Sequence, residues 1–289
     1  MSSSLNSPLL SEARSFLFVP GNRPERFDKA LGSPANMVIV DLEDAVPAAD
    51  KAAARIALAA AWQQWPKAQR ARVLVRINAA QTDSHQDDLA WLVQLPGLPA
   101  VMVPKAEQPR DLTGVQDVLG EAATALVPII ESAEGLANVD ALARSPRVLR
   151  LAFGNLDFQA DLGMASGADE AELAPARLAI VVASRRAGLA APIDGVTTDT
   201  QDMARVQTDA ARSLRFGFGA KLCIHPLQVA AVHAAFAPTA AQIDWARRVL
   251  QAEAAAGGGA FTVDGRMVDP PVLKLARQCL ALSRSDATD

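Results

Sequence analysis

Short apolar runs alternate with longer amphipathic stretches along most of this 289-residue chain. Apolar runs of this length, bounded by turn residues, are typical of buried parallel strands. We therefore predict strands at Ser15–Val19, Met37–Asp41, Val73–Ile77, Ala100–Val103, Ala125–Ile130, Val148–Phe153, Ala191–Val196 and Ala220–Ile224. The segments between them predict helices at Pro24–Leu31, Asp50–Trp65, Asp87–Leu95, Pro109–Leu119, Glu134–Ala143, Glu170–Ala187, Asp202–Phe216 and Leu227–Ala235.

This regular alternation predicts an α/β protein with a (β/α)8 TIM barrel spanning residues 1–238. A doubly wound sheet is the structural alternative, although such sheets usually contain fewer strands. Residues 239–289 predict a C-terminal helical extension, with helices at Thr239–Ala256 and Pro270–Leu282 on either side of the Gly257–Gly259 break. An extension that leaves the barrel could cover its own active site or that of a neighbouring subunit.

Composition narrows the class of protein. Half of the residues are hydrophobic, which permits a large core, and the net charge of −4 argues against a nucleic-acid binder. Cys223 and Cys279 lie in apolar contexts, which favours a reducing compartment over a disulfide framework. The first eight residues lack the pattern of a leader, and no run approaches the roughly 20 apolar residues that span a bilayer. These features predict a soluble, cytoplasmic protein.

Two carboxylates stand at or just beyond the ends of predicted strands. Glu131 follows the fifth strand and Asp157 follows the sixth. Because the C-terminal ends of barrel strands meet at the active-site mouth, both acids are expected to converge there. Two anions in a half-buried site repel unless a cation lies between them, and Mg²⁺ prefers carboxylate oxygens. Glu131 and Asp157 therefore predict a magnesium site, with helix capping as the alternative role.

A second acidic group follows the second strand. Alternation places Asp41 and Glu43 on one side of the extended chain, with Asp44 at the turn. We expect these acids to orient metal-bound water by accepting its hydrogen bonds. The alternative for Asp44 is a cap for the next helix.

Cations end the third and fourth strands. The planar guanidinium of Arg76 suits a carboxylate or a developing enolate oxygen, although an internal ion pair with Asp41 or Glu43 is equally open. Lys105 has the same two alternatives, a rim cation or a salt bridge to a rim acid.

The loop after the first strand carries further basic residues. Arg23 and Lys29 flank a helix start at Pro24, where exposed amides would suit phosphate groups. A plain helix start is the alternative, because no Walker-type signature is present. His225 is expected to bond to backbone, and Cys223 has no evident partner base. No Ser/His/Asp order and no dinucleotide-binding glycine motif follows a strand, which disfavours hydrolases and dehydrogenases.

Together these motifs resemble the citrate lyase β-subunit-like proteins of the HpcH/HpaI aldolase superfamily, in its CoA-thioester lyase branch. The resemblance runs from about Arg14 to Leu282, through Phe16–Pro24, Asp41–Val46, Val75–Asn78, Val103–Lys105, Ile130–Ser132, Ala152–Asp157, Leu222–Pro226 and Asp264–Pro271. It implies a TIM barrel, usually trimeric, that uses Mg²⁺ to make or break a carbon–carbon bond in 3-hydroxy-acyl-CoA thioesters. Citryl-, malyl-, citramalyl- and methylmalyl-CoA all remain candidate substrates.

The resemblance also implies roles for individual residues. Glu131 and Asp157 match the metal ligands, and Arg76 matches the partner of the substrate carboxylate and enolate. Glu43 and Asp44 match acids near the metal-bound waters, and Arg23 and Lys29 lie in the segment that meets CoA phosphates. Asp269 matches an acid delivered by a neighbouring subunit, with a helix N-cap as the alternative. The chain departs from many relatives at Asn155-Leu156, where they carry an Ala-Glu pair.

Three other functions remain open on the sequence. The chain could be the β subunit of a citrate lyase complex that acts on an acyl-carrier-protein thioester. The same barrel and metal could serve an aldolase for free hydroxy-keto acids. A non-catalytic protein whose acids hold a structural ion is the third alternative. The expected partners are an acyl-CoA substrate and further copies of this chain, as a homotrimer or a multiple of it, with no nucleic acid and no membrane.

Overall fold

The computed structural model describes residues 8–256 and 259–285. Contacts divide the chain into two compact units, Met1–His233 and Ala234–Asp289. This division falls inside helix α12 (Gln228–Phe236), a few residues before the boundary expected from the sequence. Residues 1–7 and the first two glycines of the predicted Gly257–Gly259 break lie outside the described residues.

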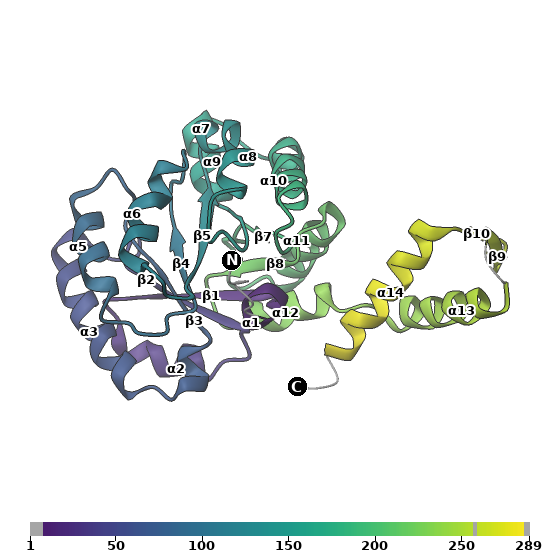
Figure 1. Ribbon diagram of the computed structural model, residues 1–289, viewed down its shortest axis with the longest axis horizontal. Coiled ribbons are helices and arrows are strands. Elements are labelled where there is room, and N and C mark those ends of the chain that lie inside the picture. The colour runs from purple at the N-terminus through teal and green to yellow at the C-terminus, as the bar shows by residue number, and fades with distance from the viewer. Residues whose placement is uncertain (1–7, 257–258, 286–289) are drawn as a thin grey trace. The chain divides into compact units, whose positions relative to one another are not determined.

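The first unit is built on eight parallel strands that close into a barrel in the order β1 to β8 (Figure 1). Pairing of Phe16 with Met37 joins the first two strands, and pairing of Ser15 with Lys221 closes the cylinder. The predicted (β/α)8 barrel is therefore confirmed. The strands are β1 (Ser15–Pro20), β2 (Met37–Asp41), β3 (Val73–Arg76), β4 (Ala100–Val103), β5 (Ala125–Ile130), β6 (Ala152–Phe153), β7 (Ile193–Asp194) and β8 (Ala220–Cys223).

Strands β6 and β7 are shorter than the sequence predicted. Pro192 has no backbone N–H to donate, so regular pairing in β7 begins only at Ile193. Single backbone bonds still bridge the preceding residues, such as the one from Leu149 N–H to Leu126 O at 3.1 Å. Regular β6 pairing likewise starts only at Ala152, which pairs with Ile129.

Helices connect successive strands around the barrel. They are η1 (Pro24–Arg26), α2 (Phe27–Leu31), η2 (Ala48–Asp50), α3 (Lys51–Gln64), α4 (Lys67–Arg70), α5 (Asp83–Leu92), α6 (Arg110–Leu119), α7 (Ala133–Ala137), α8 (Val139–Ala143), α9 (Asn155–Leu162), η3 (Ala171–Leu173), α10 (Ala174–Arg186) and α11 (Met203–Phe216). The sequence did not predict α4, α9 or the N-terminal α1 (Pro8–Glu12). Helix α9 matters most, because it carries a predicted metal ligand.

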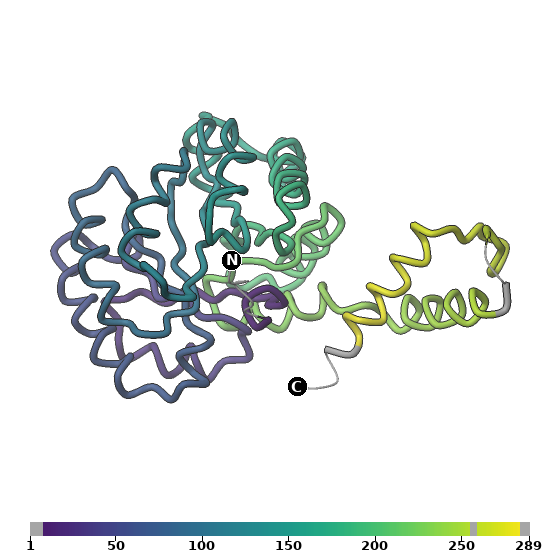
Figure 2. Tube along the Cα trace, viewed as in Figure 1, coloured from purple at the N-terminus to yellow at the C-terminus, as the bar shows by residue number. Residues whose placement is uncertain are grey.

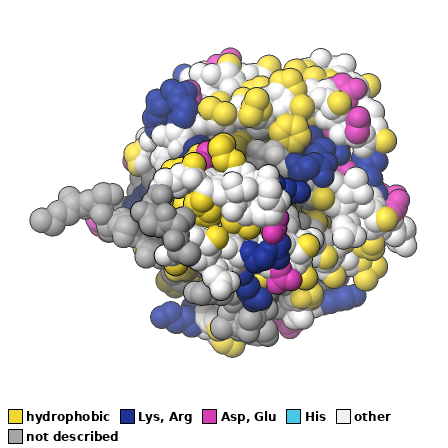
Figure 3. All heavy atoms as spheres, turned by 90° about the vertical axis from the view of Figure 1, so that its right-hand side faces the viewer, with side chains coloured by type: hydrophobic (Ala, Val, Ile, Leu, Met, Phe, Trp, Pro, Cys, Tyr) yellow, Lys and Arg dark blue, Asp and Glu magenta, His cyan; other side chains and the backbone are white. Residues whose placement is uncertain are grey.

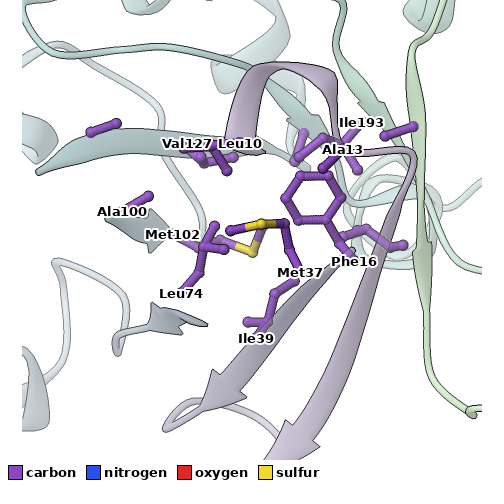
Figure 4. Packing of buried hydrophobic residues seen from close by; sticks show 14 of the residues in the cluster. Leu10, Ala13, Phe16, Met37, Ile39, Leu74, Ala100, Met102, Val127 and Ile193 are labelled. Atoms are coloured by element: carbon purple, nitrogen blue, oxygen red, sulfur yellow. The ribbon is translucent and has the colours of Figure 1, made fainter. Parts of the chain in front are cut away.

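Alternate side chains of the strands fill the barrel interior, as Figure 4 shows for Phe16, Met37 and Met102. Leu10 of α1 and Ala13 join this cluster. The buried Arg150 guanidinium donates hydrogen bonds to the carbonyl oxygens of Leu10 and Ala13 at 3.0 and 2.8 Å. These bonds fasten the N-terminal segment to the barrel, so the site must form at the opposite, C-terminal ends of the strands.

The second unit holds α13 (Ala240–Ala256), β9 (Phe261–Val263), β10 (Arg266–Val268) and α14 (Pro270–Ser285), traced in Figure 2. Its own apolar cluster includes Val249 and Ala276 from the two helices. The antiparallel strands form a hairpin, which the sequence did not predict. Asp264 and Gly265 both have positive φ, at 51° and 73°, as a type I′ turn requires.

The surface carries mixed charge. On the face drawn in Figure 3, basic side chains lie among acidic and apolar ones, in keeping with the small net charge of −4. Over the described residues, no helix combines the length and the apolar character that crossing a membrane requires.

Candidate active site

A cavity of about 300 Å³ lies at the C-terminal ends of the strands. Five of the residues that line it are charged, and the sequence analysis had singled out each of them: Asp41, Asp44, Arg76, Glu131 and Asp157. They come from β2, β3, β5 and α9 or the residues directly after those strands. Of the eight predicted site residues, the cavity lining therefore includes four: Asp44, Arg76, Glu131 and Asp157.

Glu131 follows β5 directly and is 4% exposed. Its Oε1 accepts a hydrogen bond from the Lys105 backbone N–H at 2.6 Å. Gly154 packs against the other side of this carboxylate, since a Cβ at position 154 would lie only 2.6 Å from the Glu131 Cβ. Only a residue without a side chain leaves Glu131 in this position.

Asp157 was expected just beyond a strand end, but it lies in the first turn of α9. The helix begins at Asn155, directly after the cap residue Gly154. A carboxylate near a helix N-terminus is stabilised by the helix dipole. Asp157 therefore still lines the same cavity as Glu131, although a helix positions it.

The electrostatic surroundings of Glu131 favour its protonated form. Burial, followed by the negative charges of Asp157 and Glu43, raises the pKa of Glu131 to about 8. Burial and neighbouring negative charge both favour a cation beside this carboxylate. A hard divalent cation held by Glu131 and Asp157 would supply that charge through oxygen ligands.

The donor set fits a cation that keeps water or substrate among its ligands. Within the described part of the chain, no group of three or more His, Cys, Asp or Glu residues is placed to hold a metal ion. Magnesium commonly binds through one or two carboxylates and retains several waters. Glu131 and Asp157 match that arrangement.

Arg76 forms the internal ion pairs that the sequence analysis had left open. Its Nε and Nη2 donate to the two Asp41 carboxylate oxygens at 2.7 and 2.6 Å, and Nη1 lies 2.9 Å from Glu43 Oε2. A guanidinium has five N–H donors, so these contacts leave some for a ligand. The Arg76 guanidinium also lies 4.8 Å from the Phe18 ring centre, which fixes its plane.

Lys105 links the acidic residues to one another. Its Nζ lies 2.5 Å from Glu43 Oε1 and 3.5 Å from Asp44 Oδ2, so the salt bridge at the rim is the observed arrangement. Lys105 has a φ of +48°, a costly conformation for a residue with a side chain. This conformation lets one residue contact Glu131 through its N–H and Glu43 through its ammonium. Asp44 is half exposed and caps neither following helix, whose cap residues are Pro47 and Asp50.

Lys51 was not predicted as a site residue from the sequence. Its ammonium donates to the carbonyl oxygens of Leu42 and Glu43, both at 2.9 Å, and also to Asn78 Oδ1. These bonds fix the loop that presents Glu43 and Asp44. A lysine seven positions after the acidic Asp41–Asp44 segment was the available sequence signal.

The predicted phosphate-binding residues do not line the cavity. Arg23 and Lys29 are exposed, and Arg23 Nε donates to Glu25 at 2.6 Å. The expected single helix at this position is a three-residue η1 followed by a five-residue α2, so it provides little dipole for an anion.

Three other predicted residues have local roles. In the second unit, Asp269 Oδ1 accepts a hydrogen bond from Val272 N–H at 3.2 Å, the N-cap that the sequence analysis gave as the alternative. His225 Nδ1 accepts a bond from Leu227 N–H at 3.3 Å. Burial raises the pKa of Cys223 to about 12, which excludes a thiolate nucleophile there.

The chain is similar to known proteins over most of its length. The family model described as HpcH/HpaI aldolase/citrate lyase matches residues 14–226. A citrate lyase subunit beta-like protein of Deinococcus radiodurans is 40% identical over 277 residues, covering 93% of this chain and 96% of the relative. The mitochondrial citramalyl-CoA lyase of Rattus norvegicus is 31% identical over 304 residues, covering 98% and 89%.

A solved structure shares the fold over nearly the whole chain. The protein CitE from Mycobacterium tuberculosis, in complex with magnesium, acetoacetate and coenzyme A, superposes with a TM-score of 0.84. It is 34% identical and covers 95% of this chain and 99% of its own. The chain therefore belongs to the HpcH/HpaI aldolase/citrate lyase family, whose named relatives include lyases.

Proposed function

We propose that this protein is a Mg²⁺-dependent carbon–carbon lyase that cleaves a 3-hydroxy-acyl-CoA thioester into acetyl-CoA and a 2-keto acid. The convergence of Glu131 and Asp157 on one cavity, beside the ion-paired Arg76, is the observation that carries the proposal. The citramalyl-CoA lyase relative, and the magnesium and coenzyme A bound to CitE, support it.

The cleavage is a retro-aldol (Claisen-type) step. The hydroxyl on C3 loses its proton to a base, and C3 becomes the carbonyl carbon of the keto acid. The electron pair of the C2–C3 bond moves to C2 and forms the enolate of the acetyl thioester, which a proton then converts to acetyl-CoA. Magnesium held by Glu131 and Asp157 would supply Lewis-acid stabilisation of oxygen charge in this step.

The residues of the chain orient the substrate and its developing charge. The Arg76 N–H groups that Asp41 and Glu43 leave free donate to the substrate carboxylate or enolate oxygen. Glu43 and Asp44 accept hydrogen bonds from water molecules beside Glu131 and Asp157. Arg23 and Lys29 bind the phosphates of CoA at the protein surface.

The C-terminal unit, residues 239–289 in the sequence-based division, acts on the site of a neighbouring subunit within a trimer or a multiple of it. Asp269 delivers the proton to the enolate carbon there, a role whose loss typically costs ~10²–10⁴-fold in rate.

An assay with purified protein, Mg²⁺ and citramalyl-, malyl-, citryl- and methylmalyl-CoA tests the proposal. Asp157→Ala should abolish cleavage of whichever thioester the parent protein accepts, while circular dichroism stays unchanged. Asp140→Ala, an exposed acid in α8, is the matched control and should retain activity. Full activity of Asp157→Ala would refute the metal assignment. Cleavage only of free hydroxy-keto acids would favour an aldolase instead.

The role of a neighbouring subunit has its own test. Mixing Asp157→Ala with Asp269→Ala should restore some activity, because a mixed assembly contains sites with both acids intact. If the subunits demonstrably exchange and no activity returns, Asp269 does not act across subunits.

A further inference from the structure

The cavity has two unlike halves. The charged residues described above come from β2, β3, β5 and α9. The half formed by β7, β8 and β1 is lined by apolar side chains instead: Phe18, Pro20, Val196, Leu222 and Ile224, with Leu156 of α9 beside them. Since β7, β8 and β1 are neighbours in the closed barrel, this apolar half is continuous.

Two of these side chains face open space. Leu156 is 46% exposed and Ile224 is 40% exposed, although both are large and hydrophobic. Exposed apolar side chains inside a cavity favour an apolar ligand group, which removes them from water.

Buried amides hold this half in place. The Asn155 side chain, 2% exposed, donates to Val196 O at 3.1 Å and accepts from Val196 N–H at 2.9 Å. Gln228, 1% exposed, accepts from Ile224 N–H at 2.9 Å and donates to Thr197 O at 2.8 Å. The loops after β7 and β8 are thus tied to α9 and α12, and the apolar surface is built into the fold.

A carboxylate bound in this half would find no cationic partner. Among the described residues that line the cavity, Arg76 is the cation, and it belongs to β3 in the charged half. The N–H groups that Asp41 and Glu43 leave free there are the ones assigned to the substrate carboxylate or enolate oxygen. The nearby Lys221 is 1% exposed, and its Nζ donates to Gly195 O at 2.7 Å. Burying a charge without a partner is strongly unfavourable, whereas burying a methyl group is favourable.

We propose that Leu156, Val196 and Ile224 form a subsite for an alkyl substituent on the hydroxyl-bearing carbon C3 of the substrate. The inference rests on the proposed lyase function. It names the preferred substrate class as thioesters with a methyl group at C3, such as citramalyl-CoA. Malyl-CoA, with hydrogen at C3, leaves the subsite unfilled, and citryl-CoA places a carboxymethyl group against it.

Both cleavage and binding test the subsite. The keto-acid products keep the C3 substituent, so glyoxylate, pyruvate and oxaloacetate form the matching series. In the parent protein, kcat/KM for citramalyl-CoA should exceed that for malyl-CoA and for citryl-CoA by at least about tenfold, within the range that one methyl group gives in an apolar pocket. Calorimetry with Mg²⁺ present should show that pyruvate binds more tightly than glyoxylate and oxaloacetate.

Variants at the half-exposed Leu156 should not impair folding. Leu156→Ala should reduce the preference for the methyl-bearing ligand over the hydrogen-bearing one by about threefold or more, because it shortens one wall of the subsite. Leu156→Lys should raise the relative activity toward citryl-CoA by supplying the missing cation. Leu162→Ala, at the far end of α9 with 42% exposure and no place in the cavity lining, is the matched control and should keep the parent preference.

The outcomes separate the two proposals. If the parent protein cleaves none of the thioesters, the lyase proposal fails, while the keto-acid binding order still tests the subsite. If it cleaves them and Leu156→Ala leaves the ratios unchanged, the subsite is wrong. An equal loss for all three thioesters would overturn it too, because Leu156 would then contact a part that they share.

Discussion

Replacing Gly154 with alanine should disable the site without unfolding the barrel. Gly154 has φ and ψ of −93° and 78°, close to the inverse γ-turn conformation that residues with a side chain also adopt, so the substitution adds no left-handed strain. The added methyl group would lie 2.6 Å from Glu131 Cβ and 3.1 Å from its Cδ. Both distances are shorter than ordinary contacts, which begin near 3.4 Å.

The size of the effect follows from these distances. Relief of the Cβ contact requires a movement of about 0.8 Å between positions 131 and 154. Because a Cβ atom moves only with its backbone, rotation of the Glu131 side chain cannot absorb the shift. Displacement of an active-site group by about 1 Å can cost roughly 100-fold in rate. We expect kcat/KM to fall about 100-fold and the apparent Mg²⁺ affinity to fall about 10- to 100-fold.

Steady-state cleavage and calorimetric titration with Mg²⁺ measure the two effects, and urea unfolding reports stability. Gly167→Ala is the matched control, since its Cβ would meet nothing closer than 3.4 Å. That control should retain activity and could gain about 0.4–1 kcal/mol in the free energy of unfolding through reduced chain entropy. A Gly154→Ala protein with normal Mg²⁺ affinity and normal kcat/KM would refute the packing argument.

Three further predictions concern residues outside the metal site. Lys51→Met should lower kcat about 10- to 100-fold with little change in KM, because the loop that carries Glu43 loses its bonds to the ammonium, and Lys51→Arg should restore part of the rate. Arg177→Met should lower the free energy of unfolding by about 3–5 kcal/mol in urea titrations, because it removes the guanidinium that pairs with the buried Asp194 at 3.1 Å, and Arg177→Met combined with Asp194→Asn should cost less. Burial raises the pKa of Cys223 to about 12, so the folded protein keeps this thiol protonated as pH rises past its ordinary pKa near 9. Iodoacetamide at pH 8.5 should therefore leave Cys223 unmodified until urea unfolds the chain. Labelling of Cys223 in the native protein at the rate of a free thiol would contradict its burial.

The barrel could be predicted because each strand is a short apolar run between turn residues, as in Ala125–Ile130 and Ala100–Val103. Their ends follow from local sequence alone. The late start of β7 also has a local cause, because Pro192 has no N–H to donate and the hydrophobic pattern alone does not account for a proline. Helix α9 was not predicted because it is only eight residues long and has no clear apolar stripe. Its start depends on Gly154, whose packing against Glu131 is a long-range contact.

The charged residues that line the cavity could be predicted better than their hydrogen-bond and ion-pair partners. Asp41, Arg76 and Glu131 stand at or just after strand ends, and the C-terminal ends of all strands of a (β/α)8 barrel lie on the same face. Their common location at the mouth of the barrel could therefore be predicted. Whether Arg76 faces a substrate or the neighbouring Asp41 depends on cross-strand register, which spacing within one strand does not reveal. The same limit applies to Lys51, whose role arises from a contact with carbonyl groups rather than from a motif.

The charged half of the cavity behaves as one connected unit. The Lys51 ammonium donates a hydrogen bond to the Glu43 carbonyl, and the Glu43 carboxylate forms salt bridges with Arg76 and Lys105. The backbone N–H of Lys105 in turn donates to the Glu131 carboxylate. Each group is thus oriented by another before any ligand arrives, and such preorganisation is the condition under which dipoles and charges stabilise a transition state most effectively. The apolar half needs no such network, because burial of an alkyl group is not directional. Substitutions in the charged half should therefore act on kcat through their neighbours, whereas substitutions at Leu156 should act on the choice between substrates.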